Sequence, residues 1–200
     1  MAASVLYMSV SVDGFIAGPN ESPDNGLGDG GHRLHDWLFA GGDVDLEAIR
    51  NAGGANGQII DESMATGAIV AGRGTFEPAG GWGGNHHDDV PIFIPYRDEP
   101  GIDISGWPLV HAVDDVPTAM RLAKEAAGER NVLVHGAGIT RLALAAGVLD
   151  EIELHVVPVL FGDGNRLFDG LEPGQVELEC TRVLQGEGGV THLHYRVIRD

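Results

Sequence analysis

The sequence has only one lysine, Lys124, and one cysteine, Cys180, and its 30 acidic residues outnumber 12 basic ones, for a formal net charge of −18. So acidic a chain repels phosphate backbones and anionic lipid, which argues against nucleic acid and membrane surfaces as partners. A single cysteine excludes an internal disulfide and any CxxC metal or redox pair.

Long hydrophobic runs are absent as well. The apolar run at residues 5–12 is short and lacks the basic lead of a secretory signal. No stretch reaches the roughly 18 apolar residues that a membrane span requires. We therefore expect a cytoplasmic protein. With 200 residues, 43% of them hydrophobic, we expect one domain over residues 1–200.

Apolar runs of strand length recur along the chain, and helix-like stretches follow several of them. Helices are predicted at 119–127, after Asp115 and Pro117, and at 140–146. This alternation predicts an α/β fold with a mostly parallel central sheet and helices on both faces. Beyond residue 162, apolar and polar residues alternate at 175–184 and 190–198, which predicts antiparallel strands at the C-terminal end of the chain. The strand-like runs before it lie at 5–12, 68–71, 91–94, 109–113, 131–134 and 152–160.

Two glycine-containing turns sit where a predicted strand passes into a helix. Gly72-Arg73-Gly74-Thr75 follows one strand, and Gly136-Ala137-Gly138 follows another. Such turns lie at the carboxyl edge of a parallel sheet, where helix N-termini offer free N–H groups to phosphate. Tight helix–strand packing explains a single such turn equally well, but two turns, one with an arginine, favour a dinucleotide.

Four segments together resemble the dihydrofolate reductase-like superfamily, and most closely its riboflavin-pathway reductase domains: "MSVSVDGFIAGPN", "VAGRGTFE", "NVLVHGAG" and "GVLDEIELHVVPVLFGDGNRLFDG". The resemblance runs nearly end to end. It implies a mixed, mostly parallel sheet flanked by helices, with NADPH across the strand ends. Hydride would pass from NADPH to a small-molecule substrate, either a heterocycle or a carbonyl-like carbon.

The resemblance also implies roles for individual residues. Gly72, Arg73 and Thr75 match the turn that holds the adenosine side of the cofactor, and Ile16 and Ala17 match backbone that brackets the nicotinamide. The turn under the pyrophosphate corresponds to Gly136, Ala137, Gly138, Ile139 and Thr140. The resemblance further places a cis peptide at Gly136–Ala137.

Hydride transfer usually needs a proton source beside the accepting atom. Asp13 is the candidate by motif, with a turn aspartate capping Gly14 as the alternative. Asp36, next to His35, lies where the resemblance places a substrate-binding acid. Trp37 and Phe39 could form the floor of a ring-binding pocket, or they could belong to the hydrophobic core.

The sequence also departs from the family pattern. Phe15 stands where riboflavin-pathway reductases carry a phosphate-holding lysine. A reductase with an unassigned substrate is therefore the main interpretation, and a riboflavin-pathway reductase is the alternative. Pro95-Tyr96-Arg97 replaces a Thr-His pair near the adenosine ribose, although Arg97 could meet a 2′-phosphate. A non-catalytic nucleotide-binding protein is a further alternative.

Two expectations concern metals and assembly. His86-His87-Asp88-Asp89 could bind a metal, but no histidine pair has a recognised metal-site spacing with a further ligand nearby, so we predict no metal site. A homodimer is expected, because the family commonly pairs through its sheet and the strands at 175–184 and 190–198 would otherwise leave a flat edge exposed.

Overall fold

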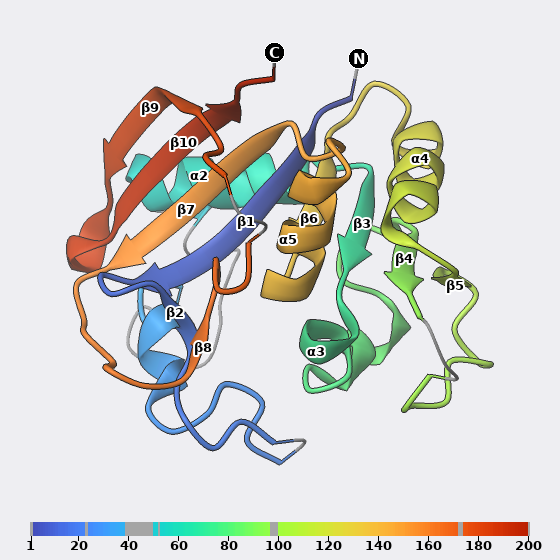
Figure 1. Ribbon diagram of the computed structural model, residues 1–200, viewed down its shortest axis with the longest axis horizontal. Coiled ribbons are helices and arrows are strands. Elements are labelled where there is room, and N and C mark those ends of the chain that lie inside the picture. Colours follow the sequence, from blue (N-terminus) through green and yellow to red (C-terminus); the bar gives the residue numbers. More distant parts are fainter. Residues whose placement is uncertain are drawn as a thin grey trace.

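An eight-stranded sheet forms the centre of the protein, in the order β5-β4-β3-β6-β1-β7-β10-β9 (Figure 1). The computed structural model describes residues 2–22, 24–38, 50–51, 53–96, 100–171 and 174–199. The sheet is parallel from β5 to β7, and β10 and β9 continue it antiparallel. Its strands are β1 (Ser4–Ser11), β3 (Ala68–Ala71), β4 (Ile92–Pro95), β5 (Val110–Val113), β6 (Val132–His135), β7 (Glu151–Val157), β9 (Leu178–Gln185) and β10 (Thr191–Val197).

A second, two-stranded antiparallel sheet lies beside the end of β1. It pairs β2 (Phe15–Ala17) with β8 (Asn165–Arg166). The backbone packs tightly here, since a Cβ placed on Gly164 would lie 2.2 Å from the carbonyl oxygen of Ala17. Glycine at position 164 therefore allows β8 to close over β2.

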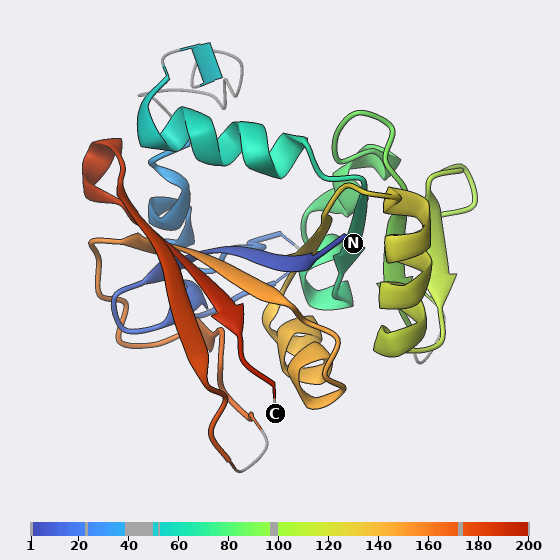
Figure 2. The same cartoon turned by 90° about the horizontal axis from the view of Figure 1, so that it is seen from above.

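Helices cover both faces of the central sheet (Figure 2). Helix α2 (Gly54–Met64) lies on one face, and α4 (Val116–Ala127) and α5 (Ala137–Ala145) lie on the other. The short helix α3 (Arg73–Phe76) follows β3 directly. The described residues also form three 3-10 turns: η1 (Gly31–His35), η2 (Gly80–Gly84) and η3 (Glu187–Gly189).

The side chains of β1 alternate between the two cores. Val5 and Tyr7 join the cluster under α2, whereas Leu6 and Val10 join the cluster under α4 and α5. Period-two alternation places successive strand residues on opposite faces, so a strand buried on both sides reads as a continuous apolar run. Helix α4 begins as its sequence predicts, since the Asp115 carboxylate accepts a hydrogen bond from the Thr118 N–H at 2.7 Å.

The α/β fold with a mostly parallel sheet and an antiparallel finish is confirmed. The strand predicted at 152–160 ends earlier, at Val157, because Pro158 follows and has no N–H for the ladder. Helix α2 was not expected, since its sequence opens on Gly54 and is only weakly amphipathic. Within the described ranges, no helix combines the length and apolar character of a membrane span.

Candidate functional site

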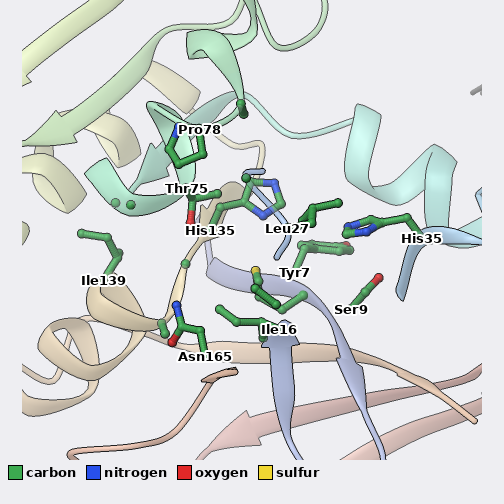
Figure 3. A pocket seen from close by; sticks show the side chains of 18 of the residues that line it. Tyr7, Ser9, Ile16, Leu27, His35, Thr75, Pro78, His135, Ile139 and Asn165 are labelled. Carbon is green, nitrogen blue, oxygen red and sulfur yellow. The ribbon is translucent and has the colours of Figure 1, made fainter. Parts of the chain in front are cut away.

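A cavity of about 1140 Å³ opens at the carboxyl ends of β1, β3 and β6 (Figure 3). Pockets for one small ligand typically measure about 300–1,000 Å³, so this cavity has room for a cofactor and a second small molecule. Its walls come from β1, β2, the loop that follows β2, α2, the turns after β3 and β6, and β8.

The turn after β3 brings Gly72, Arg73, Gly74 and Thr75 to the cavity wall. The Arg73 side chain is 56% exposed and its Nε lies 3.8 Å from Glu77. A surface pair at this distance contributes little, so the guanidinium is available to an anion.

The turn after β6 brings Gly136, Ala137, Gly138 and Ile139 to the same wall. Gly136 is the N-cap of α5 with φ 107° and ψ 146°, a conformation that L side chains rarely adopt. Gly138 has an ordinary helical position, and a Cβ placed on it would meet nothing within 4 Å. The missing side chain at Gly138 therefore leaves open space at the helix N-terminus.

The two turns pack directly against each other. The Gly72 N–H donates to the His135 carbonyl at 3.1 Å, and a Cβ on Gly136 would lie 2.6 Å from Thr75 Oγ1. A side chain at Gly136 would thus collide with the neighbouring turn rather than enter the cavity. Gly136 serves the packing of the two turns, and Gly138 keeps the surface open.

One expectation for this turn is wrong. No cis peptide occurs among the described residues, which include Gly136–Ala137; the positive φ of Gly136 makes the bend instead. Thr140 does not line the cavity, because its hydroxyl is fully buried and donates to the Gly136 carbonyl at 2.8 Å. Thr140 therefore stabilises the turn through this hydrogen bond to the Gly136 carbonyl.

Ile16 and Ala17 line the cavity from β2, between the glycine turns and the far end of the pocket. Both side chains are buried, at 8% and 4% exposure. Figure 3 shows Ile16 between Ile139 on one side and Ser9 on the other. The resemblance assigns this position to the nicotinamide.

Asp13, the proposed proton source, and Asp36, the proposed substrate-binding acid, are both absent from the described residues that line the cavity. Asp13 accepts hydrogen bonds from Ser11 Oγ and from the backbone N–H groups of Phe161 and Gly162, at 2.7–3.2 Å. Desolvation acts to raise its pKa, but these hydrogen bonds outweigh it and hold the pKa at about 2. Asp13 thus has the geometry of a structural aspartate, which the sequence left open as its alternative.

Asp36 lies on the surface, where its carboxylate pairs with Arg33 at 2.9 Å. Its neighbour His35 lines the cavity instead. Arg97 and Phe39 fall outside the described residues.

The far end of the cavity is lined by side chains that the sequence analysis largely missed. We call them the α2 half: Tyr7, Ser9, Trp37, Ile59, Ile60, Ser63, Met64 and His155. Of these, only Trp37 was proposed as a pocket residue. The apolar or small residues of α2 recur at helical spacing, which could have indicated one continuous face.

Burial keeps four histidines of the cavity wall neutral: His35, His86, His135 and His155. Burial lowers the pKa of His135 and of His35 to about 4, and that of His86 to about 3. Burial also lowers the pKa of His155 well below its usual range. Trp82 and His86 pack edge to face, with ring centroids 4.7 Å apart. Within the described part of the chain, no three His, Cys, Asp or Glu side chains form a group able to hold a metal ion.

Comparison with known proteins agrees with this geometry. Residues 103–192 match the sequence model of the RibD C-terminal domain. No curated protein matches the sequence.

Among solved structures, a putative riboflavin biosynthesis protein from Shewanella sp. PV-4 is similar, with a TM-score of 0.69 and 18% identity over 98% of this chain and 99% of that one. RibD from Acinetobacter baumannii gives 0.61 and 13%, over 100% of this chain and 59% of that one. Dihydrofolate reductase from Enterococcus faecalis, solved with NADP(H), gives 0.58 and 14%, over 98% and 97%. The predicted dihydrofolate reductase-like fold is confirmed.

Proposed function

We propose that this dihydrofolate reductase-like protein is an NADPH-dependent reductase that delivers hydride to a small heterocyclic or carbonyl-type substrate. One observation carries the proposal. The two glycine turns pack together at the carboxyl ends of β3 and β6, and Gly74 and Gly138, which both line the cavity, leave open space there. A dinucleotide needs such an exposed backbone surface at strand ends and helix N-termini.

The residues present fit an extended, anionic cofactor. The N-terminus of α5 carries roughly half a positive charge and would face the pyrophosphate beside Gly138. Arg73 can pair with a phosphate on the adenosine side, which favours NADPH over NADH. Arg97 is a further candidate for binding the 2′-phosphate. Ile16 and Ala17 would bracket the nicotinamide.

When bound, the cofactor supplies a hydride to the carbon of a C=N or C=O bond, and the nitrogen or oxygen of that bond takes up one proton. The chain's part is to hold the two partners together and to limit access of water. Because neither Asp13 nor Asp36 lines the cavity, we propose that the proton comes from solvent through hydroxyl groups such as those of Tyr7 and Ser9.

Thermal unfolding with and without NADPH tests this proposal. A ligand that binds only the native state adds RT ln(1 + [L]/Kd), about 2.7 kcal/mol at a hundredfold excess over Kd. We expect NADPH to raise the Tm and the Arg73→Ala variant to lose much of that shift. Arg121→Ala removes the same charge from the exposed surface of α4, where Arg121 pairs with Glu125, and should keep the shift. An unchanged Tm of the unmodified protein at millimolar NADPH would contradict the proposal.

Two alternatives, one narrower and one of a different class, have support of their own. The match of residues 103–192 favours a riboflavin-pathway reductase, whereas the buried Phe15 at the expected lysine position disfavours it. The absence of Asp13 and Asp36 from the described cavity lining favours a non-catalytic nucleotide binder. Oxidation of NADPH with candidate substrates separates them, because a pure binder would show the Tm shift without turnover.

A further inference from the structure

A short left-handed turn, η2, places Trp82 in the cavity wall. Residues 80–84 all have positive φ, and Trp82 itself has φ 51°, which a residue other than glycine adopts only where its surroundings fix it. The Trp107 ring fills the space behind the turn, because a Cβ on Gly81 or Gly84 would lie 2.3–2.4 Å from it. The glycines therefore let the turn close against Trp107, and the packing holds Trp82 at the cavity.

Two histidine rings line the cavity next to Trp82. The Trp82 ring centroid lies 4.7 Å from that of His86 and 6.0 Å from that of His135, and the two imidazole centroids are 5.6 Å apart. His135, whose ring is shown in Figure 3, ends β6 and directly precedes Gly136. We call Trp82, His86 and His135 the histidine corner. It adjoins the turn proposed to hold the cofactor.

A chain of hydrogen bonds fixes which nitrogen of His86 carries the proton. The Thr66 hydroxyl donates to the Ser63 carbonyl at 2.7 Å, so its oxygen accepts from His87 Nε2 at 3.2 Å. His87 and His86 meet through their Nδ1 atoms at 2.8 Å, and only one proton fits between two nitrogens in contact. Burial lowers the pKa of His87 and keeps it neutral, so its Nδ1 accepts and His86 Nδ1 donates.

His86 thereby keeps a lone pair on Nε2. Burial lowers the pKa of His86 to about 3, so the ring takes up no second proton. Nε2 has no hydrogen-bond partner among the described residues, and it is not sealed off from the cavity. The second nitrogen of the neutral ring is therefore available as an acceptor to a bound molecule.

His135 offers a second lone pair. Burial lowers its pKa to about 4 and outweighs a hydrogen bond with the Tyr7 backbone, which acts to raise it. A backbone group that raises the pKa of a histidine is a carbonyl that accepts its N–H. Since a neutral imidazole has one N–H, the other ring nitrogen of His135 is an acceptor.

No fixed charge lies close to the histidine corner among the described residues. The ionisable groups that act on the pKa of His86 are His135 and His87, and those that act on the pKa of His135 are His35 and His87. An anionic group placed here would face two lone pairs without a counter-charge, which is unfavourable in a buried site. The corner therefore favours a ligand group that donates.

We propose that the histidine corner binds a primary ammonium group carried by the substrate. This inference rests on the proposed function, since the ligand of the cavity is taken to be the molecule that receives the hydride. An ammonium group has three N–H donors and no acceptor, so it complements two lone pairs. Hydrogen bonds from a charged donor are about twice as strong as neutral ones, and an indole ring attracts a cation within about 6 Å. The net charge of −18 also favours the approach of a cation.

Three small probes separate the parts of this inference: benzylamine, benzyltrimethylammonium and benzyl alcohol. The second keeps the positive charge but has no N–H, and the third keeps a donor but has no charge. With NADP⁺ saturating, so that the cofactor part of the cavity is filled, we expect benzylamine to bind about tenfold more tightly than either, as measured by tryptophan fluorescence. Benzylamine binding no more tightly than one of the other two, or no binding of any probe at millimolar concentration, would overturn the inference.

Substitution of His86 tests the corner from the protein side. His86→Phe keeps a ring in place, removes the lone pair, and should lower the affinity for benzylamine about tenfold while changing that for benzyltrimethylammonium less than about twofold. His111→Phe is the matched control, because His111 is exposed on β5 and stacks on Phe93 with ring centroids 5.1 Å apart. An equal effect of both variants, or none from His86→Phe, would contradict the assignment. The comparison of probes on the unmodified protein needs neither variant to fold.

The thermal shift with NADPH separates the two proposals. A protein that NADPH stabilises but that binds benzylamine no better than benzyltrimethylammonium keeps the proposed function and loses this inference alone. A protein that NADPH does not stabilise loses the proposed function, and with it the claim that the ammonium group belongs to a substrate.

Discussion

Replacing Gly138 with leucine should separate the binding of cofactor from the stability of the fold. Gly138 lies in the first turn of α5 at an ordinary helical φ, is exposed, and has nothing within 4 Å of where its Cβ would be. It also lines the cavity. A leucine here should fit the folded protein while filling space that the cofactor's phosphates would need.

The magnitude follows from the two effects. Leucine is a better helix former than glycine by up to about 0.8 kcal/mol, less in the first turn, so the ligand-free protein should be unchanged or slightly stabilised. At a hundredfold excess of NADPH over Kd, the unmodified protein should gain about 2.7 kcal/mol. For a chain of this size that is about 5–11 °C in Tm, and the Gly138→Leu variant should lose most of it.

Gly136→Ala is the matched contrast two residues away. Its φ of 107° is unfavourable for alanine, at a cost of about 1–3 kcal/mol, and its Cβ would lie 2.6 Å from Thr75 Oγ1. This variant should lower the Tm of the ligand-free protein by several degrees, unlike Gly138→Leu. Differential scanning fluorimetry of both variants, with and without NADPH, measures all four quantities.

The reasoning has a clear refutation. If Gly138→Leu keeps the full NADPH shift, the N-terminus of α5 does not face the cofactor. If Gly136→Ala leaves the Tm of the ligand-free protein unchanged, the two glycine turns are not packed as described.

Three further predictions concern other parts of the molecule. Asp13→Asn should lower stability, because it weakens the acceptor for Ser11, Phe161 and Gly162, yet keep NADPH-dependent turnover; a folded but inactive variant would restore Asp13 as the proton donor. Hydrogen bonds to Glu151 and then Glu153 raise the pKa of His194 from its usual 6.5 to about 9. This shift contributes up to about 3 kcal/mol to the free energy of unfolding. The contribution is fully present below pH 6.5 and should be lost as the pH rises through 9. Urea unfolding at pH 6 and pH 9 measures this loss, and His194→Gln should remove most of the pH dependence. Light scattering should give twice the 21.0 kDa chain mass, since β9 is an exposed edge strand with Val183 at 57% exposure; a monomer at micromolar concentration would refute the dimer.

The sequence by itself determined the central sheet and the two glycine turns. Strands such as β3 and β6 are buried on both faces, so they appear as unbroken apolar runs that need no knowledge of their neighbours. The start of α4 is equally local, because Asp115 caps a helix whose own first turn supplies the partner. Glycines at strand ends also mark the turns, whatever those turns later contact.

Only the tertiary structure decided which side chains meet at the cavity. Helix α2 has weak local signals, and its position depends on contacts across the chain, such as that between Asn56 and His192, 136 residues apart. Asp13 looks like a catalytic acid in its motif, yet the backbone of Phe161 and Gly162, nearly 150 residues away, occupies its carboxylate. Gly136 and Gly138 look alike in sequence, but a neighbouring turn faces one and open space the other. Such roles depend on long-range packing, which no local pattern of residues specifies.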